Sequence, residues 1–124
     1  MTQFILPMPP SVNSIWRGKN KGVYRSAEYV KWISDATILV YSQRVVSVFP
    51  PYKVTYEFSK PITKKGKQSK VRMDLANREK ALSDLLQKCN VITDDCEIID
   101  MCLRWVEDLK PNHVRISIQT IGDT

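Results

Sequence analysis

The segment Tyr52-Lys53-Val54-Thr55-Tyr56-Glu57-Phe58-Ser59 alternates apolar and polar side chains with a period of two residues. In a β-strand, successive side chains point to opposite faces, so every second residue from Val54 to Phe58 would face a core. The polar residues between them would face water. The alternation therefore predicts a strand with one buried face, around which the rest of the chain can be arranged.

Helical spacing is found on both sides of this strand. Upstream, Ser26 can cap a helix that continues to about Arg44. Downstream, a second amphipathic helix ends near Asn90. The apolar positions that define these helices are Tyr29, Ile33, Ala36 and Val40 in the first, and Leu75, Leu82, Leu85, Leu86 and Cys89 in the second.

Three further segments, residues 3–6, 97–105 and 114–119, are apolar or alternating and predict strands. Residues 60–72 carry six positive charges, no negative charge and one glycine, which indicates a mobile basic loop. The resulting order, β-α-β-α-β-β, contains no repeat. It predicts a single small α/β (α+β) domain over residues 1–124, with a mixed sheet and two main helices.

The composition restricts the number of domains and the class of binding partner. The 124 residues fit one domain whose core gives modest stability, so dimerisation would help. The 19 lysines and arginines outnumber the 13 acidic residues, and the net charge of +6 favours a polyanion such as nucleic acid as the partner. A basic protein that is merely soluble is the alternative.

The cysteines and the hydropathy exclude several other classes. Cys89, Cys96 and Cys102 form no Cys-x-x-Cys pair and lie within or beside apolar stretches, so we expect reduced core residues of a cytoplasmic protein. A zinc site is disfavoured, because His113 is the only histidine. No segment approaches the ~20 apolar residues that a membrane span needs.

Acidic side chains flank the second helix. Asp74 precedes it with Asn77 close by, Lys80 follows about one turn later, and Asp94 and Asp95 come directly after the helix. Carboxylate oxygens are the ligands that Mg²⁺ prefers, and a lysine beside them could stabilise negative charge on a phosphate. The alternative is that Asp74 caps the helix, the later pair forms a surface turn and Lys80 is solvated.

Two segments could contact DNA. Residues 60–72 lead directly into Asp74, and in residues 9–17 Trp16 could stack on a base while Arg17 holds a phosphate. The candidate DNA contacts are Asn13, Trp16, Arg17, Lys64, Lys65, Lys67, Lys70 and Arg72. The alternatives are a solvated loop at 60–72, and a turn shaped by Asn13 with Trp16 packed against the fold.

Three segments carry a resemblance: Pro9-Pro10-Ser11-Val12-Asn13-Ser14-Ile15-Trp16-Arg17, then Asp74-Leu75-Ala76-Asn77 with Lys80, then Val91-Ile92-Thr93-Asp94-Asp95. In the same order, they are similar to the P-P-S-x-N-x-x-[YW]-R, D-x-D-N-x-x-K and apolar-x-D-D motifs of the RusA family of Holliday junction resolvases. These are phage- and prophage-associated endonucleases. Length and element order also fit, so the resemblance covers essentially the whole chain.

The resemblance implies a homodimeric, Mg²⁺-dependent endonuclease, with Mn²⁺ as a possible substitute, in a bacterial or phage-infected cell. Such an enzyme binds four-way DNA junctions and nicks two strands symmetrically. Asp74 and Asp95 match the catalytic metal-binding aspartates of the family, Asp94 matches the neighbouring acid, and Lys80 matches the essential lysine. Two sites related by a two-fold axis suit a junction that is itself nearly two-fold symmetric.

The chain departs from the family pattern at Ala76, where the second aspartate of D-x-D-N is expected. On an extended approach to the helix, side chains 74 and 76 would point the same way and serve one metal site. The missing carboxylate predicts weaker Mg²⁺ binding and cleavage slower by orders of magnitude, with junction binding retained. Glu79 could in principle replace it, but would lie on a different helical face from Lys80.

Two explanations of Ala76 compete. Either the natural protein has an aspartate there and this chain was inactivated to hold its substrate, or the lineage has lost or relocated the ligand. The intact remainder of the motifs favours the first. Two other functions stay open: a non-catalytic protein that binds junctions or branched DNA, and a general basic nucleic-acid-binding module. The sequence has no helix-turn-helix, zinc-finger or RNP signature to support the latter.

Overall fold

The computed structural model describes residues 2–10, 16–17, 24–60 and 75–122. Four strands form one mixed sheet in the order β1-β6-β4-β5. They are β1 (Thr2–Pro7), β4 (Tyr52–Ser59), β5 (Ile98–Val106) and β6 (His113–Thr120). Strand β6 is antiparallel to both of its neighbours, whereas β5 runs parallel to β4. The expected small α+β domain with a mixed sheet is confirmed.

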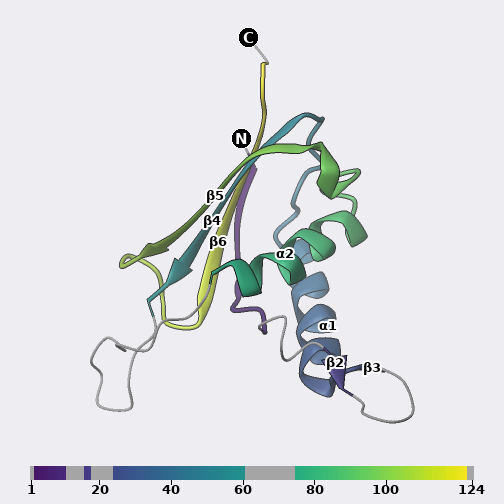
Figure 1. The fold of residues 1–124 in the computed structure, drawn as a ribbon, viewed down its shortest axis with the longest axis vertical. Helices are drawn as coiled ribbons and strands as arrows, with labels where there is room; N and C mark the ends of the chain where they lie inside the picture. Colours follow the sequence, from purple (N-terminus) through teal and green to yellow (C-terminus); the bar gives the residue numbers. More distant parts are fainter. Residues whose placement is uncertain (1, 11–15, 18–23, 61–74, 123–124) are drawn as a thin grey trace.

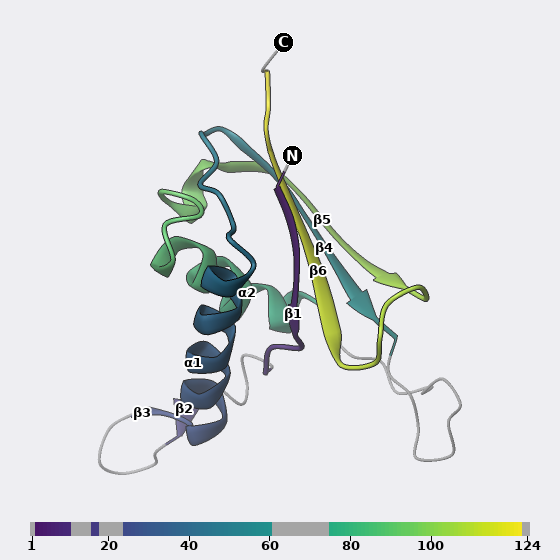
Figure 2. The ribbon, with the colours of Figure 1, turned by 180° about the vertical axis from the view of Figure 1, so that it is seen from behind.

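Two helices, α1 (Ala27–Ser42) and α2 (Ala76–Lys88), lie against one face of this sheet, as Figures 1 and 2 show from opposite sides. The predicted cap of α1 is confirmed, because the Ser26 hydroxyl accepts a hydrogen bond of 3.2 Å from the backbone N–H of Tyr29. Helix α2 lies between β4 and β5 in the chain. Parallel strands need such a crossover, so α2 is placed over the sheet by the strand order itself.

The alternation in β4 has the predicted outcome. Its apolar side chains are fully buried against the helices, whereas Lys53 on the other face is exposed. The same alternation buries every second residue of β6. The core between sheet and helices includes Leu6, Tyr29, Ala36, Tyr52, Val54, Tyr56, Phe58, Leu82, Leu85, Leu86, Val114, Ile116 and Ile118.

The structure adds local detail to the predicted elements at three places. The composition of residues 11–25, which include Asn13, Gly18, Asn20 and Gly22, predicts a loop, but this range contains a two-residue antiparallel pair, β2 (Trp16–Arg17) with β3 (Tyr24–Arg25), too short to give an alternation signal. Helix α1 ends at Ser42, because Arg44 adopts a positive φ of 53° that a right-handed helix cannot continue through. A short 3₁₀ helix, η2 (Asp95–Glu97), precedes β5.

The cysteines were also expected to lie in the core. Cys89 does, at the end of α2, but Cys96 is exposed and Cys102 is half-buried; all three are free thiols. Cys102 lies beside Thr55 in the β4–β5 register, on the sheet face that no helix covers, so its apolar neighbours in sequence do not bury it. Residues 61–72 of the predicted mobile basic loop lie outside the described residues.

Candidate metal and phosphate site

Lys80 on α2 joins the second and third motifs in space. Its Nζ lies 3.0 Å from Oδ1 of Asp84 and 3.8 Å from Oδ2 of Asp95. The hydrogen bond and charge of Asp84, followed by the charge of Asp95, raise the pKa of Lys80 above its ordinary value. The ammonium is still more than half exposed, so it is charged and can also meet an anion that arrives from solvent.

Asp84 is a member of this group that belongs to none of the three sequence motifs. It lies four residues beyond Lys80, and an i,i+4 pair on a helix brings two side chains together. That spacing is the signal that could have identified it. Asp84 holds the lysine from the side of the helix, while Asp95 approaches it from the following segment.

A tight return after α2 brings Asp95 to the lysine. Asn90 ends the helix with a positive φ of 58°, a conformation that asparagine tolerates better than most residues, and the chain turns back. Figure 1 shows the segment between α2 and β5 returning beside α2. The side-chain Oε1 of Gln87 then accepts a hydrogen bond of 3.2 Å from the backbone N–H of Asp95.

The sheet anchors the same return. The buried Tyr52 of β4 places its hydroxyl 3.0 Å from the backbone nitrogen of Thr93, from which it accepts a hydrogen bond. The two side-chain hydroxyls of Tyr52 and Thr93 lie 3.2 Å apart. The position of the Asp94–Asp95 pair therefore depends on a core tyrosine.

Asp94 and Asp95 were predicted to form part of a metal site, and they lie together. One ligand atom each of Asp94, Asp95 and Cys96 lies within 4.8 Å of the other two. Asp94 caps η2 by accepting a hydrogen bond of 3.1 Å from the backbone N–H of Cys96. Hydrogen bonds from the Cys96 side chain and backbone lower the pKa of Asp94, which is therefore ionised at neutral pH.

The donor set fits a hard divalent cation. Two adjacent carboxylates offer oxygen ligands, which Mg²⁺ prefers, and leave room for the waters that it keeps. The Cys96 thiol, whose pKa is raised by its hydrogen bond to Asp94, stays protonated and is a poor ligand for such an ion. Asp94 and Asp95 would hold the ion, and two carboxylates leave a place for a third.

Glu79 is near this acidic group, and its charge also helps to raise the pKa of Lys80, but its carboxylate is engaged elsewhere. Its carboxylate accepts a hydrogen bond from Ser83, whose hydroxyl is 2.9 Å from that of the buried Tyr56. The chain Tyr56–Ser83–Glu79 runs along the buried side of α2, and burial raises the pKa of Tyr56 well above its ordinary range. Glu79 is therefore held toward the sheet. This agrees with the prediction that Glu79 lies on a different face of the helix from Lys80.

Arg78 connects the first turn of α2 with the N-terminal proline motif. Its Nη1 donates a hydrogen bond to the backbone carbonyl of Pro9, and the Nε atom is buried without a partner among the described residues. Desolvation lowers the pKa of Arg78 below its ordinary value. Beside it lies a hollow of about 430 Å³, lined in part by Pro10, Trp32 and Asn112. The first and second motifs are thus neighbours.

Several predicted site residues cannot be placed in this geometry. Asp74, Asn13, Lys64, Lys65, Lys67, Lys70 and Arg72 lie outside the described residues. Trp16 and Arg17 form β2, where they pair with Arg25 and Tyr24 of β3. Ala76 is the first residue of α2.

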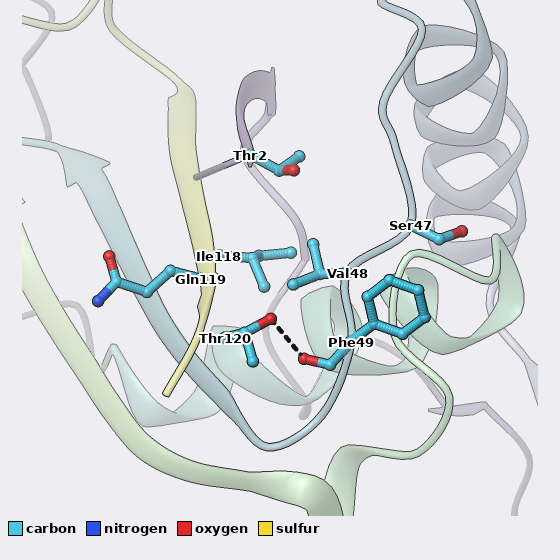
Figure 3. A pocket seen from close by; sticks show the side chains of 7 residues that line it. All are labelled: Thr2, Ser47, Val48, Phe49, Ile118, Gln119 and Thr120. Carbon is cyan, nitrogen blue, oxygen red and sulfur yellow. Dashed lines mark hydrogen bonds between the residues drawn. The ribbon is translucent and has the colours of Figure 1, made fainter. Parts of the chain in front are cut away.

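A second hollow of similar size, about 440 Å³, is not part of this site. Figure 3 shows its lining residues, Thr2, Ser47, Val48, Phe49, Ile118, Gln119 and Thr120. The Thr120 hydroxyl donates a hydrogen bond of 2.7 Å to the carbonyl of Phe49 across its wall. None of the seven side chains titrates near neutral pH, so this hollow offers neither metal ligands of suitable charge nor an acid–base group.

An acidic pair beside a charged lysine, on a small basic α+β domain, defines a candidate nuclease. Comparison with known proteins agrees. The family model described as "Endodeoxyribonuclease RusA" matches residues 7–119, nearly the whole chain. The chain therefore belongs to the RusA family of endodeoxyribonucleases, the Holliday junction resolvases that its three motifs resemble. Membership implies a metal-dependent hydrolase.

A curated relative supports the assignment. The chain is 25% identical over 119 residues to the crossover junction endodeoxyribonuclease RusA of Shigella sonnei (strain Ss046). That alignment covers 95% of this chain and 93% of the relative, so the likeness extends over the whole fold. Within the described ranges, neither helix combines the length and the hydropathy that crossing a bilayer requires.

Proposed function

We propose that this chain is built as a Mg²⁺-dependent, structure-specific endonuclease that binds four-way DNA junctions and resolves them by symmetric paired nicks. It would act as a homodimer in the cytoplasm of a bacterial or phage-infected cell. The ion pair between Lys80 and Asp95 supports this most, because it joins two of the three family motifs at one point of the surface. The net charge of +6 suits a DNA substrate.

Each side chain of the site has a proposed role. Asp94 and Asp95, together with Asp74, would hold the ion, which when bound polarises the phosphodiester and supplies hydroxide at neutral pH; Mn²⁺ could replace Mg²⁺. Lys80, kept charged by Asp84 and Asp95, would bind the scissile phosphate and neutralise the charge that develops on it. Gln87 and Tyr52 would keep Asp95 in register with the lysine.

The DNA would be held by basic and aromatic groups beside this centre. We assign phosphate contacts to Arg17, to Arg72 and to the lysines of the preceding loop, and a stacking contact to Trp16. Asn13 would shape the entry of the proline motif or contact the backbone. The hydrogen bond from Arg78 to Pro9 supports this arrangement, because it joins the proline motif to the helix that carries Lys80.

Ala76 would leave this chain impaired in cleavage but able to bind. It opens α2 at the point where the family has its second aspartate, and one ligand and one negative charge are missing there. The Glu79 carboxylate accepts a hydrogen bond from Ser83, so it would have to give up that bond to replace the missing ligand. A protein that binds junctions without cutting them is the second candidate, and Ala76 is the observation that favours it.

The test is cleavage of a synthetic four-way junction in Mg²⁺ by the given chain, by Ala76→Asp and by Ala76→Asn. The asparagine variant matches the aspartate in shape but lacks its charge. We expect paired nicks from Ala76→Asp alone, with similar junction affinity for all three. Equal cleavage by the given chain and Ala76→Asp would contradict the impairment. No cleavage by any of them, with junction preferred over duplex, would leave binding as the function.

A further inference from the structure

The two edge strands of the sheet differ in how their backbones are covered. At β1, the side-chain amide of Gln43 donates a hydrogen bond of 2.8 Å to the carbonyl of Ile5 and accepts one of 3.2 Å from its N–H. The indole of Trp32 donates a third, of 3.0 Å, to the carbonyl of Pro7. These side chains occupy the hydrogen-bonding groups that another strand would need, so β1 is closed to further pairing.

The edge at β5 has no such cover among the described residues. The strand is nine residues long and pairs on one side only, with β4. No described side chain hydrogen-bonds to its backbone. A long uncovered edge strand is a template for another strand, and proteins usually blunt such an edge or use it.

The side chains of β5 are also of the kind that protein interfaces contain, namely partly exposed apolar groups and exposed charges. The register with β4 places Met101 and Leu103 on the helix side, beside Val54 and Tyr56. Met101 is nevertheless 39% exposed and Leu103 only partly buried, because the helices do not cover this edge. On the other face Asp100 and Arg104 are exposed, and neither forms an ion pair with a described residue. The strand thus has partly exposed apolar side chains on one face. On the other it has two charges without an oppositely charged partner among the described residues, although the Arg104 guanidinium donates a hydrogen bond of 3.5 Å to Sγ of Cys102.

We propose that β5 pairs antiparallel with β5 of a second copy of this chain, about a two-fold axis at Cys102. In this register Asp100 of each copy lies opposite Arg104 of the other, Met101 lies opposite Leu103, and Cys102 lies opposite itself. A shift by one residue in either direction separates the two charges and loses both pairs. The strand is therefore self-complementary in one register, as a two-fold interface requires.

This pairing rests on the proposed function, because it assigns an interface to the homodimer proposed there. The two halves would form one continuous sheet with both helical layers on the same side. At about 3.3 Å per residue, the two copies of Ile98 would lie about 26 Å apart across the axis. Because η2 directly precedes Ile98, the two acidic sites would flank the axis on one face, accessible to one DNA junction.

The test is a charge exchange in the full chain, with the dimer dissociation constant measured by sedimentation over a dilution series. Arg104→Asp places two aspartates opposite each other at two points of the interface. We therefore expect the dimer dissociation constant to rise about tenfold or more. The double variant Asp100→Arg with Arg104→Asp restores both opposite-charge pairs and should restore the dimer. Lys31→Asp, on the exposed face of α1, changes the net charge equally and should leave the dimer intact.

Oxidative cross-linking gives a second readout that does not depend on stability. Opposed residues of an antiparallel pair have Cα atoms about 4.5–5.5 Å apart, within the range that a disulfide spans. The Cys96→Ser variant, which keeps Cys102, should form a covalent dimer on mild oxidation, and additional Cys102→Ser should abolish it. Cys89 is buried and serves as an internal control.

The outcomes separate this interface from the proposed function. A monomer at every concentration, failure of the double exchange to restore the dimer, or no cross-link through Cys102 would overturn the β5 pairing even if the Ala76→Asp variant resolves junctions. Restoration by the double exchange together with the cross-link would establish the pairing even if no variant cuts DNA.

Discussion

Replacing Tyr52 by phenylalanine should loosen the segment that carries Asp94 and Asp95, the proposed metal ligands, while leaving the core filled. The ring of Tyr52 is fully buried and would stay in place. What is lost is the hydroxyl, which accepts a hydrogen bond of 3.0 Å from the N–H of Thr93 and lies 3.2 Å from the Thr93 hydroxyl. These contacts hold the segment that leads into Asp94 and Asp95.

The magnitude follows from the number and exposure of these contacts. Each hydrogen bond contributes about 0.5–1.5 kcal/mol net. Thr93 is exposed, so water can partly replace the lost partner, and we expect a loss of about 1–2 kcal/mol. For a domain of this size that corresponds to a fall in Tm of about 4–8 °C. Cleavage should fall by about tenfold to a hundredfold, because small displacements of a catalytic group have such effects.

Tyr56→Phe is the matched control. It removes the same atom from the same strand, but the hydroxyl lost there is bonded to Ser83 on α2 and not to the acidic segment. We expect a similar fall in Tm, with cleavage reduced less. Both variants would be assayed on a four-way junction in the Ala76→Asp background, and hydrogen exchange of the Thr93 amide would be measured in the given chain.

The decisive result is the exchange rate of that amide. Tyr52→Phe should accelerate it strongly, whereas Tyr56→Phe should not. If Thr93 stays equally protected in both variants, the tyrosine does not anchor the segment and the reasoning fails. An equal loss of cleavage in the two variants would refute it as well.

Three other measurements probe the site and the core. Asp84→Asn should lower the pKa of Lys80 toward its ordinary value in an NMR titration, because Asp84 is the main cause of the raised pKa. The same variant should change the free energy of unfolding by less than about 0.5 kcal/mol, since the ion pair is exposed. The lowered pKa of Asp94 stabilises the fold at neutral pH, and this contribution should disappear as the pH falls below about 4; with Cys96→Ala, the carboxyl titration of Asp94 should move to higher pH. Leu85→Ala, at a fully buried position, should cost about 2–5 kcal/mol in chemical denaturation.

The sequence predicted the elements well wherever periodicity and burial agree. The two-residue alternation of β4 and the helical spacing of Leu82, Leu85 and Leu86 each follow from one face being buried, and both faces are buried as expected. The three motifs predicted the family, and Lys80 indeed meets Asp95.

What could not be predicted depends on contacts between distant parts of the chain. Nothing in the local pattern shows that Tyr52 binds Thr93 or that Arg78 binds Pro9, because each pair joins a helix or strand to a connecting segment far away in the sequence. Cys102 has apolar neighbours, but its burial is decided by which sheet face the helices cover. The β2–β3 pair is too short for any periodicity.

The place of β6 in the sheet has a consequence for how the protein is made. Of the four described strands of the sheet, β6 is translated last, yet it lies between β1 and β4 and joins them, with Thr2 opposite Ile118. Until it emerges, β1 has no strand to pair with, and β4 has only its parallel neighbour. Folding must therefore close the longest loop in the chain to complete the middle of the sheet, which predicts slow, late acquisition of structure during translation.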